Sequence, residues 1–278
     1  MCQHCFTPSS PWSARRAFIL SASATVAAPV LAQVDVGEAS AFRKLVPAGT
    51  LETAATQQYS QMLEKARAKR ALAPDDHPQL QRLRAIGRRL VPFTAPWNPR
   101  TRDWRWEINL ISSPEINAFC MPGGKIAFYT GILDKLQLTD DEAAMVMGHE
   151  MAHALREHAR ERLAKTQATN FGLRLGAQLL GLNDLGNAAA NLGGQLLTLQ
   201  FSRSDESDAD LVGLELAARA GYPPNASVKL WQKMGRATGG KSGLAFLSTH
   251  PSSPQRIHDL EKNIPKVQKL YAASTRQP

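Results

Sequence analysis

Residues 139–153 read TDDEAAMVMGHEMAH, and this stretch carries the strongest local signals in the chain. Thr139 is followed three positions later by Glu142, which is the pattern of a helix capping box. The pattern predicts a helix that starts at Thr139 and continues to about Glu161. On a helix, residues four positions apart lie about 40° apart around the axis and one turn above each other. The two histidines of the stretch would therefore share one face of the helix.

His149 and His153 at this spacing can hold one metal ion between their imidazole rings, and zinc is the usual metal of this pattern. Glu150 lies about 100° round the helix from His149, beside the metal rather than on it. A carboxylate there can act as the general base that takes a proton from the attacking water. Histidine accounts for only 7 of the 278 residues, and a chance H-E-x-x-H in such a chain is on the order of one in a hundred. We expect one zinc ion per chain.

A third metal ligand has to come from elsewhere, because a catalytic zinc has three protein ligands and one open position. The segment Glu206–Asp210 lies on a second predicted helix, from Ser204 to about Ala220. Glu206 can bind the metal, while Asp210, one turn later, can accept a hydrogen bond from a histidine ring and determine its tautomer. Alternatively, the acidic residues here simply favour a helix N-terminus through the helix dipole, which is compatible with the ligand role.

The remaining patterns predict an α+β fold. Apolar residues at helical spacing indicate helices at 51–72 and 78–90, with a loop at 92–99. Alternating residues predict a strand at 104–111. Two apolar runs, 115–121 and 125–130, are joined by a Pro-Gly-Gly turn, which is typical of a hairpin.

We therefore expect a mostly helical domain with a small antiparallel three-stranded sheet packed beside the helix that carries His149. Further helices are predicted at 225–234 and 254–264. Residues 33–100 would form an N-terminal arm and helices, and residues 101–278 the metallopeptidase core, which forms one compact domain together with 51–100.

The first 32 residues read as an export signal. Arg15 and Arg16 precede an uncharged stretch, and Val30–Ala32 offers a small-residue cleavage site. The segment resembles a twin-arginine signal, and a general secretory signal is the alternative. Cys2 and Cys5 would be removed with it, which leaves Cys120 as the only cysteine and excludes an intramolecular disulfide. We expect a periplasmic protein.

The net charge of +9 comes from basic residues that are scattered along the chain, without a nucleic-acid-binding motif. We expect a solvated basic surface and no nucleic-acid partner. Residues 170–200 are apolar but interrupted by Asn, Gln and Gly. This favours packing inside the protein, and peripheral contact with a membrane is the alternative. The oligomeric state is not indicated by any pattern.

Four motifs together resemble a known family. His149–His153, followed on a later helix by Glu206–Asp210, is similar to the HtpX and CAAX-prenyl-protease type of gluzincin, which includes short periplasmic BepA-like and LoiP-like peptidases. Asn117–Gly124 resembles the N-A-F-x-x-P-G-G segment of that family, and His250–Arg256 resembles its H-P-x-x-x-x-R loop. The motifs occur in the same order and span about half of the chain.

The resemblance implies a role for each matched residue. His149, His153 and Glu206 are implied as the zinc ligands, Glu150 as the catalytic base, and Asp210 as the residue that supports a ligand histidine.

The later loop adds two further roles. His250 is implied near the metal, either as a donor to the transition state or as a fourth ligand at rest. Arg256 is implied to order its loop or the wall of the active site. Two features depart from the family: the prenyl proteases have several membrane spans and BepA-like members carry a helical-repeat domain, and neither is evident here.

The leading hypothesis is a zinc-dependent periplasmic endopeptidase in protein quality control, acting on unfolded or misassembled envelope proteins. A metal-stabilised chaperone or binding protein with latent protease activity is the second, and a basic membrane-surface protein is the third. The strand at 115–121 would offer an extended peptide a free edge, unless it is fully paired within the sheet.

Overall fold

The computed structural model describes residues 34–166, 196, 199–238, 245–250 and 253–275. All of them belong to one compact unit, Leu31–Pro278. The predicted export signal and most of the apolar segment at 170–200 lie outside the described residues.

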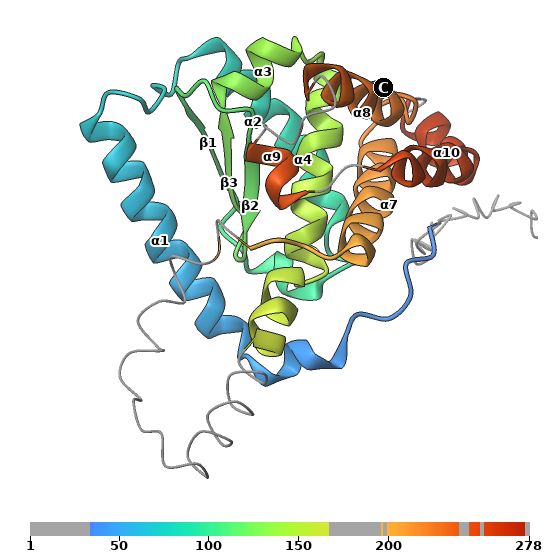
Figure 1. Cartoon of the computed structure of the whole chain (residues 1–278), viewed down its shortest axis with the longest axis horizontal. Coiled ribbons are helices and arrows are strands. Elements are labelled where there is room, and N and C mark those ends of the chain that lie inside the picture. Colours follow the sequence, from blue (N-terminus) through green and yellow to red (C-terminus); the bar gives the residue numbers. More distant parts are fainter. Residues whose placement is uncertain (1–33, 167–195, 197–198, 239–244, 251–252, 276–278) are drawn as a thin grey trace, which may run out of the picture. The chain divides into compact units, whose positions relative to one another are not determined.

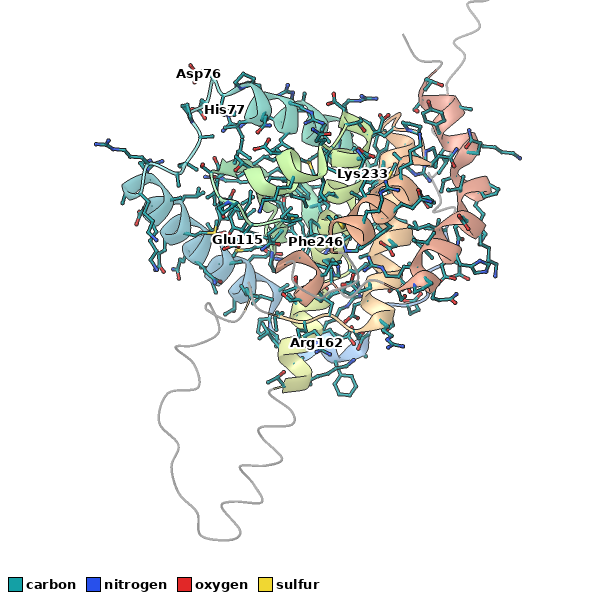
Figure 2. The ribbon with its side chains drawn as sticks, turned by 45° about the horizontal axis from the view of Figure 1, so that its top comes forward. Asp76, His77, Glu115, Arg162, Lys233 and Phe246 are labelled. Atoms are coloured by element: carbon teal, nitrogen blue, oxygen red, sulfur yellow. The ribbon has the colours of Figure 1, made fainter. Side chains whose placement is uncertain are left out.

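Helix α4, Asp140–Leu155, is the centre of the fold (Figure 1), and every residue from Glu142 onward is buried. The predicted capping box is present: Thr139 Oγ1 accepts from the Glu142 backbone at 3.3 Å, and Glu142 Oε2 accepts from the Thr139 backbone at 2.9 Å. Lys233, which Figure 2 labels on helix α8, Ala226–Thr238, also donates to Glu142 at 2.7 Å. The start of α4 is therefore held both locally and by another helix.

The prediction that this helix continues to about Glu161 was wrong. Helix α4 ends at Leu155, and a separate helical stretch covers 158–166. Between them Glu157 adopts a positive φ of 60°. A left-handed residue turns the chain out of the helical path, so the residues after it point in a new direction.

The sheet has three strands: β1, Glu107–Ile111; β2, Ala118–Met121; and β3, Lys125–Tyr129. Strands β2 and β3 form the predicted antiparallel hairpin, with Gly123 and Gly124 both at positive φ in its turn. Strand β1 pairs with β3 in parallel, so the sheet is mixed and its order is β1-β3-β2. The prediction of an antiparallel sheet was wrong for the pair β1 and β3. The turn pattern determines only the hairpin, and it leaves open in which direction β1 runs beside β3.

Helices surround the sheet and α4, as expected for the α+β class (Figure 1). The predicted N-terminal helices are α1, Ala48–Ala68, and α2, Pro78–Leu90. Helix α10, Pro254–Ser274, extends ten residues beyond its predicted end at 264. Pro265 costs it a backbone hydrogen bond without ending it.

The remaining elements are short. They are α3, Thr130–Leu136; α9, Ala245–Thr249; and the 3-10 helices Ala41–Leu45, Val91–Phe93 and Pro99–Arg102. The last two replace part of the predicted loop at 92–99. No helix among the described residues is long and apolar enough to cross a membrane.

Helix α7, Arg203–Arg219, crosses α4 at a pair of glycines. A Cβ atom on Gly213 would lie 2.7 Å from the backbone nitrogen of His149, and one on Gly148 would lie 2.9 Å from the Gly213 carbonyl oxygen. Neither glycine leaves room for a side chain, so the two backbones are in contact. This close approach brings the acidic start of α7 to the histidines of α4.

Candidate metal centre

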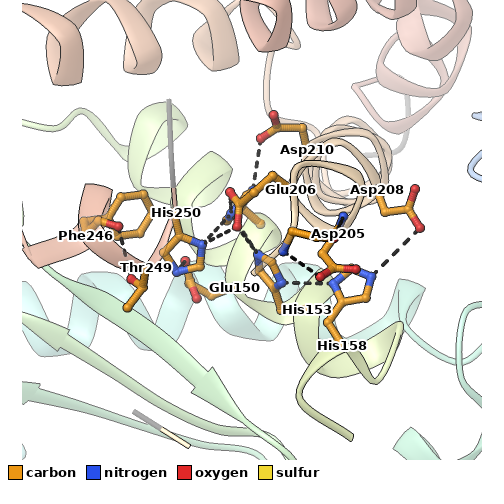
Figure 3. Close-up of polar contacts among 12 residues, drawn as sticks. Glu150, His153, His158, Asp205, Glu206, Asp208, Asp210, Phe246, Thr249 and His250 are labelled. Carbon is orange, nitrogen blue, oxygen red and sulfur yellow. Dashed lines mark hydrogen bonds and ion pairs between the residues drawn. The ribbon is translucent and has the colours of Figure 1, made fainter. Parts of the chain in front are cut away.

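Four buried side chains converge beside this crossing: His149 and His153 from α4, Glu206 from α7, and His250 after α9. Figure 3 labels the last three of them. One ligand atom from each lies within 4.8 Å of the other three. Three imidazoles and a carboxylate form the kind of donor set that binds zinc. Among the described residues this is the only such group.

The facing atoms are close enough to share one ion. Nε2 of His149 lies 3.1 Å from Nε2 of His153. The two oxygens of Glu206 lie 3.5 Å and 3.4 Å from these nitrogens. Nδ1 of His250 completes the group, 2.9 Å from Glu206 and 3.4 Å from His149. Imidazole nitrogens and carboxylate oxygens that converge this closely are the ligands of a zinc ion, so the chemistry of the donors fits one shared cation.

The protonation of these side chains depends on their surroundings. Burial lowers the pKa of His153 well below its usual value, which leaves its ring neutral and available as a ligand. Burial opposes the charge on His149 as well, but Asp210 and Glu206 outweigh it and raise its pKa to about 9. For Glu206, hydrogen bonds from the three histidines outweigh burial and lower the pKa. A metal would therefore displace a proton from His149.

Glu150 lies next to the donor group and not within it, as the helical geometry predicts. The residue is buried, and its Oε1 has no hydrogen-bond partner among the described residues. Nε2 of His250 lies 3.6 Å from that oxygen. Burial raises the pKa of the Glu150 carboxyl above its usual value. A carboxylate with a raised pKa and an uncommitted oxygen suits a general base.

Asp210 and Arg256 support the group from behind. Asp210 Oδ1 lies 3.0 Å from Nδ1 of His149. Arg256 donates to both oxygens of Asp210, at 2.6 and 2.7 Å, and its Nη1 lies 2.7 Å from Glu206. Its guanidinium also stacks on Trp231 at 3.8 Å. Burial alone would raise the pKa of Asp210, but Arg256 and His149 outweigh it and lower the pKa.

His250 is positioned by short-range contacts. Its backbone N–H donates to the Phe246 carbonyl at 2.8 Å, and its ring stacks on the Phe246 ring with 4.5 Å between centroids.

The structure thus brings together all seven residues singled out from the sequence, which come from α4, α7 and the His250–Arg256 segment.

A groove opens beside Glu150 and His250, and its wall is β2. The described part of the chain pairs β2 only with β3. Tyr129 N–H donates to the Asn117 carbonyl at 3.1 Å. Because hydrogen-bonded pairs alternate along an antiparallel ladder, Cys120 presents its backbone N–H and C=O on the opposite, free edge. Among the described residues β2 is thus an edge strand, which was one of the two sequence-based alternatives, and just before it the Ile116 carbonyl accepts from the Phe246 N–H at 3.1 Å.

Two residues near the centre were not predicted. The ring of Phe201 stacks on His153, with 4.0 Å between centroids and 27° between planes. His158 lies behind His153, with 3.0 Å between their Nδ1 atoms. Neither has a helical-spacing signal. His158 is five positions after His153, which on one continuous helix would point elsewhere.

Comparison with known proteins finds a family model and several relatives that match the chain. A sequence profile of peptidase family M48 matches residues 78–264, a range that contains all seven residues. The mitochondrial metalloendopeptidase OMA1 of Schizosaccharomyces pombe is 37% identical over 200 residues, which cover 71% of this chain and 56% of that protein.

Two bacterial proteins are also similar. Metalloprotease LoiP of Escherichia coli is 30% identical over 149 residues, covering 52% of this chain and 58% of its own. The beta-barrel assembly-enhancing protease of Yersinia pestis is 27% identical over 223 residues, covering 75% and 44%. The chain spans about half the length of the curated relatives it matches. The predicted class, zinc metalloendopeptidase, and the predicted zinc cofactor agree with this family and with the donor group.

Proposed function

The chain belongs to peptidase family M48, and from this premise we propose that it is a zinc-dependent endopeptidase with Glu150 as its general base. The observation that carries the proposal is the buried group of His149, His153 and Glu206, beside which a carboxylate oxygen of Glu150 has no hydrogen-bond partner among the described residues. The resemblance to LoiP and to the beta-barrel assembly-enhancing protease supports the family expected from the motifs. The similarity to OMA1 adds a relative outside the HtpX and prenyl-protease type that the motifs resemble.

We assign His149, His153 and Glu206 as the zinc ligands, one ion per chain. Bound zinc would supply a Lewis acid that polarises the substrate carbonyl and lowers the pKa of water. Glu150 would take the proton from the attacking water and pass it to the leaving amine. Asp210 would determine the tautomer of His149, and Arg256 would hold Asp210.

His250 has two candidate roles in this scheme. Its Nδ1 lies within the donor group, which suits a fourth ligand at rest. Its Nε2 lies 3.6 Å from Glu150, where a hydrogen bond to the charged tetrahedral intermediate would help catalysis. In the first role His250 would occupy the open coordination position of the zinc, and in the second it would leave that position open.

The free edge of β2 is the proposed binding site for an extended peptide. Backbone hydrogen bonds to an edge strand give affinity without requiring a particular sequence. This suits substrates that are unfolded, because only an unfolded segment can lie extended along the groove.

We propose that the substrates are misfolded or unassembled envelope proteins of the bacterial periplasm. The predicted signal at residues 1–32 and the name of one bacterial relative, the beta-barrel assembly-enhancing protease, support this compartment. The OMA1 relatives are named as mitochondrial, so the compartment needs its own test. Peptide mapping of exported protein should find Gln33 at the new N-terminus, and an intact Met1 in the periplasm would contradict the export.

A second candidate is a metal-stabilised periplasmic chaperone or binding protein with latent protease activity. The observation that favours it is the presence of four donors around one point, since closed four-coordinate sites are typical of structural zinc.

Glu150 distinguishes the two candidates, because it is beside the donor group and is not needed to hold a metal. Glu150→Gln keeps the size of the side chain and removes the basic carboxylate. We expect cleavage of casein or another unfolded protein to fall at least about a hundredfold, with zinc content and melting temperature unchanged. Glu64→Gln, at an exposed position of α1, is the matched control. Equal cleavage by wild type and Glu150→Gln would rule out the mechanism, and no cleavage by either would favour the binding protein.

A further inference from the structure

We propose that His158 is a positioning residue, which holds the ring of His153 from behind so that Nε2 faces the metal. The inference rests on the proposed function only in taking His153 as a zinc ligand. His158 is 3% exposed, and its Nδ1 lies 3.0 Å from Nδ1 of His153 (Figure 3). The two rings are nearly perpendicular, at 76°, with 5.0 Å between centroids.

The two histidines of α4 are therefore supported at the same atom by different groups. Each has its Nε2 in the donor group and its Nδ1 turned away from it. Behind His149 this nitrogen meets the carboxylate of Asp210 at 3.0 Å. Behind His153 it meets the ring of His158. A ligand histidine usually donates its second N–H to an acceptor, which determines both the tautomer and the orientation of the ring.

The tautomers follow from this arrangement. If Nε2 of His153 binds metal as a neutral imidazole, its Nδ1 carries the hydrogen and donates it. Nδ1 of His158 must then be the acceptor, which puts the hydrogen of His158 on Nε2. That atom is turned toward Asp208, 3.9 Å from Oδ2. The carboxylate therefore favours the tautomer of His158 that can accept from His153.

The bend at Glu157 places His158 where it can do this. With its φ of 60°, Glu157 separates α4 from the helical stretch 158–166. Its carboxylate is held by Arg160, at 2.9 and 3.0 Å. The left-handed conformation is unfavourable for a residue with a side chain, and here it returns the chain toward α4 within three residues of its end.

The neighbours of His158 are themselves held in place. Arg156 donates to Asp208 at 3.1 Å and to the carbonyls of Val36 and Gly37 at 3.2 and 2.9 Å. Asp208 comes from the same helix as Glu206, so the support of His153 is built from α7, from the bend, and from the segment at Val36 and Gly37.

The test separates an acceptor from a space-filling side chain. His158→Phe keeps a ring and removes the acceptor, whereas His158→Asn places an amide oxygen near the position of Nδ1. We expect the Phe variant to lose about 10- to 100-fold in zinc affinity, as measured by competition with a chelator. The Asn variant should recover most of that affinity. The exposed His258→Phe of α10 is the matched control and should bind zinc like wild type.

A second readout is the visible absorption spectrum of the cobalt-substituted protein, which reports ligand geometry without any substrate. We expect a changed spectrum for His158→Phe and a nearly wild-type spectrum for His158→Asn. Equal zinc affinity in wild type and His158→Phe would overturn the proposal, as would equal losses in the Asn and Phe variants. If His158→Phe does not fold, His158→Leu is the second acceptor-free variant, and failure of both to fold would assign His158 to folding instead. These readouts need no peptidase activity, so a failure of the proposed function would appear separately, as a zinc-loaded wild type that cleaves nothing.

Discussion

Asp210 accepts from Nδ1 of His149 at 3.0 Å while Arg256 donates to both of its carboxylate oxygens. The carboxylate thus connects a metal-facing histidine on α4 to the last helix of the chain. Because Arg256 also contacts Glu206 at 2.7 Å, one buried guanidinium supports two sides of the proposed zinc site.

Asp210→Asn should weaken this support while keeping the shape of the side chain. We expect zinc affinity to fall about 10- to 100-fold, since the partner of a ligand histidine typically contributes that much. The fold should also lose about 3–5 kcal/mol of unfolding free energy, because Arg256 would be left buried with fewer compensating charges. Chelator competition and urea unfolding measure the two effects. Asp259→Asn, on α10 away from the donor group, serves as the control, and an unchanged zinc affinity in Asp210→Asn would contradict the assignment.

His250→Ala should free one coordination position on the zinc. If His250 is a fourth ligand at rest, its removal lowers zinc affinity but raises basal cleavage of an unfolded protein, because a coordination position becomes available. Cleavage rates at equal zinc loading test this. A lower rate with unchanged affinity would instead assign His250 to the transition state.

Gly213→Ala should damage the crossing of α4 and α7. The added Cβ would meet backbone atoms of Gly148 and His149 at 2.7 to 2.9 Å, which no side-chain movement can relieve. We expect a loss of at least about 1–3 kcal/mol in unfolding free energy, with a weaker zinc site, because Glu206 would be moved from the histidines.

Gly235→Ala is the matched control for this change. Gly235 lies in α8, and a Cβ there would meet nothing within 4 Å. In a helix, alanine is favoured over glycine by about 1 kcal/mol, so thermal melting should show a small gain. A melting temperature for Gly213→Ala equal to that of wild type would show that the backbones are not in contact.

The capping box of α4 should make stability depend on pH in the acidic range. Burial would raise the pKa of Glu142, but Lys233 and Thr139 outweigh it and lower the pKa. A carboxyl with a lowered folded-state pKa stabilises the fold above its unfolded value, about 4.3, and loses that contribution as pH falls through the folded pKa. The stability difference between wild type and Glu142→Gln should therefore be largest near pH 7 and shrink below about pH 4. A difference that is constant from pH 7 to pH 3 would contradict this role.

Local signals in the sequence were enough for the parts of the fold that depend on neighbouring residues. The capping box at Thr139, the hairpin turn at Pro122–Gly124 and the pair His149 and His153 each involve residues within one or two turns. Their geometry follows from backbone hydrogen bonding alone, which is why spacing predicts it. The roles of Glu206, Asp210, His250 and Arg256 came instead from the family resemblance and from the chemistry expected of a zinc site.

Only the tertiary structure determined how these segments meet. The parallel pairing of β1 with β3, the bend at Glu157 and the contact of His158 with His153 have no local periodic signal. The same is true of the crossing at Gly148 and Gly213, which brings Glu206 to the histidines. These features depend on how surfaces that are distant in the sequence pack together. The two backbones can touch only where both Gly148 and Gly213 lack a side chain, and the local sequence around one glycine does not indicate the other.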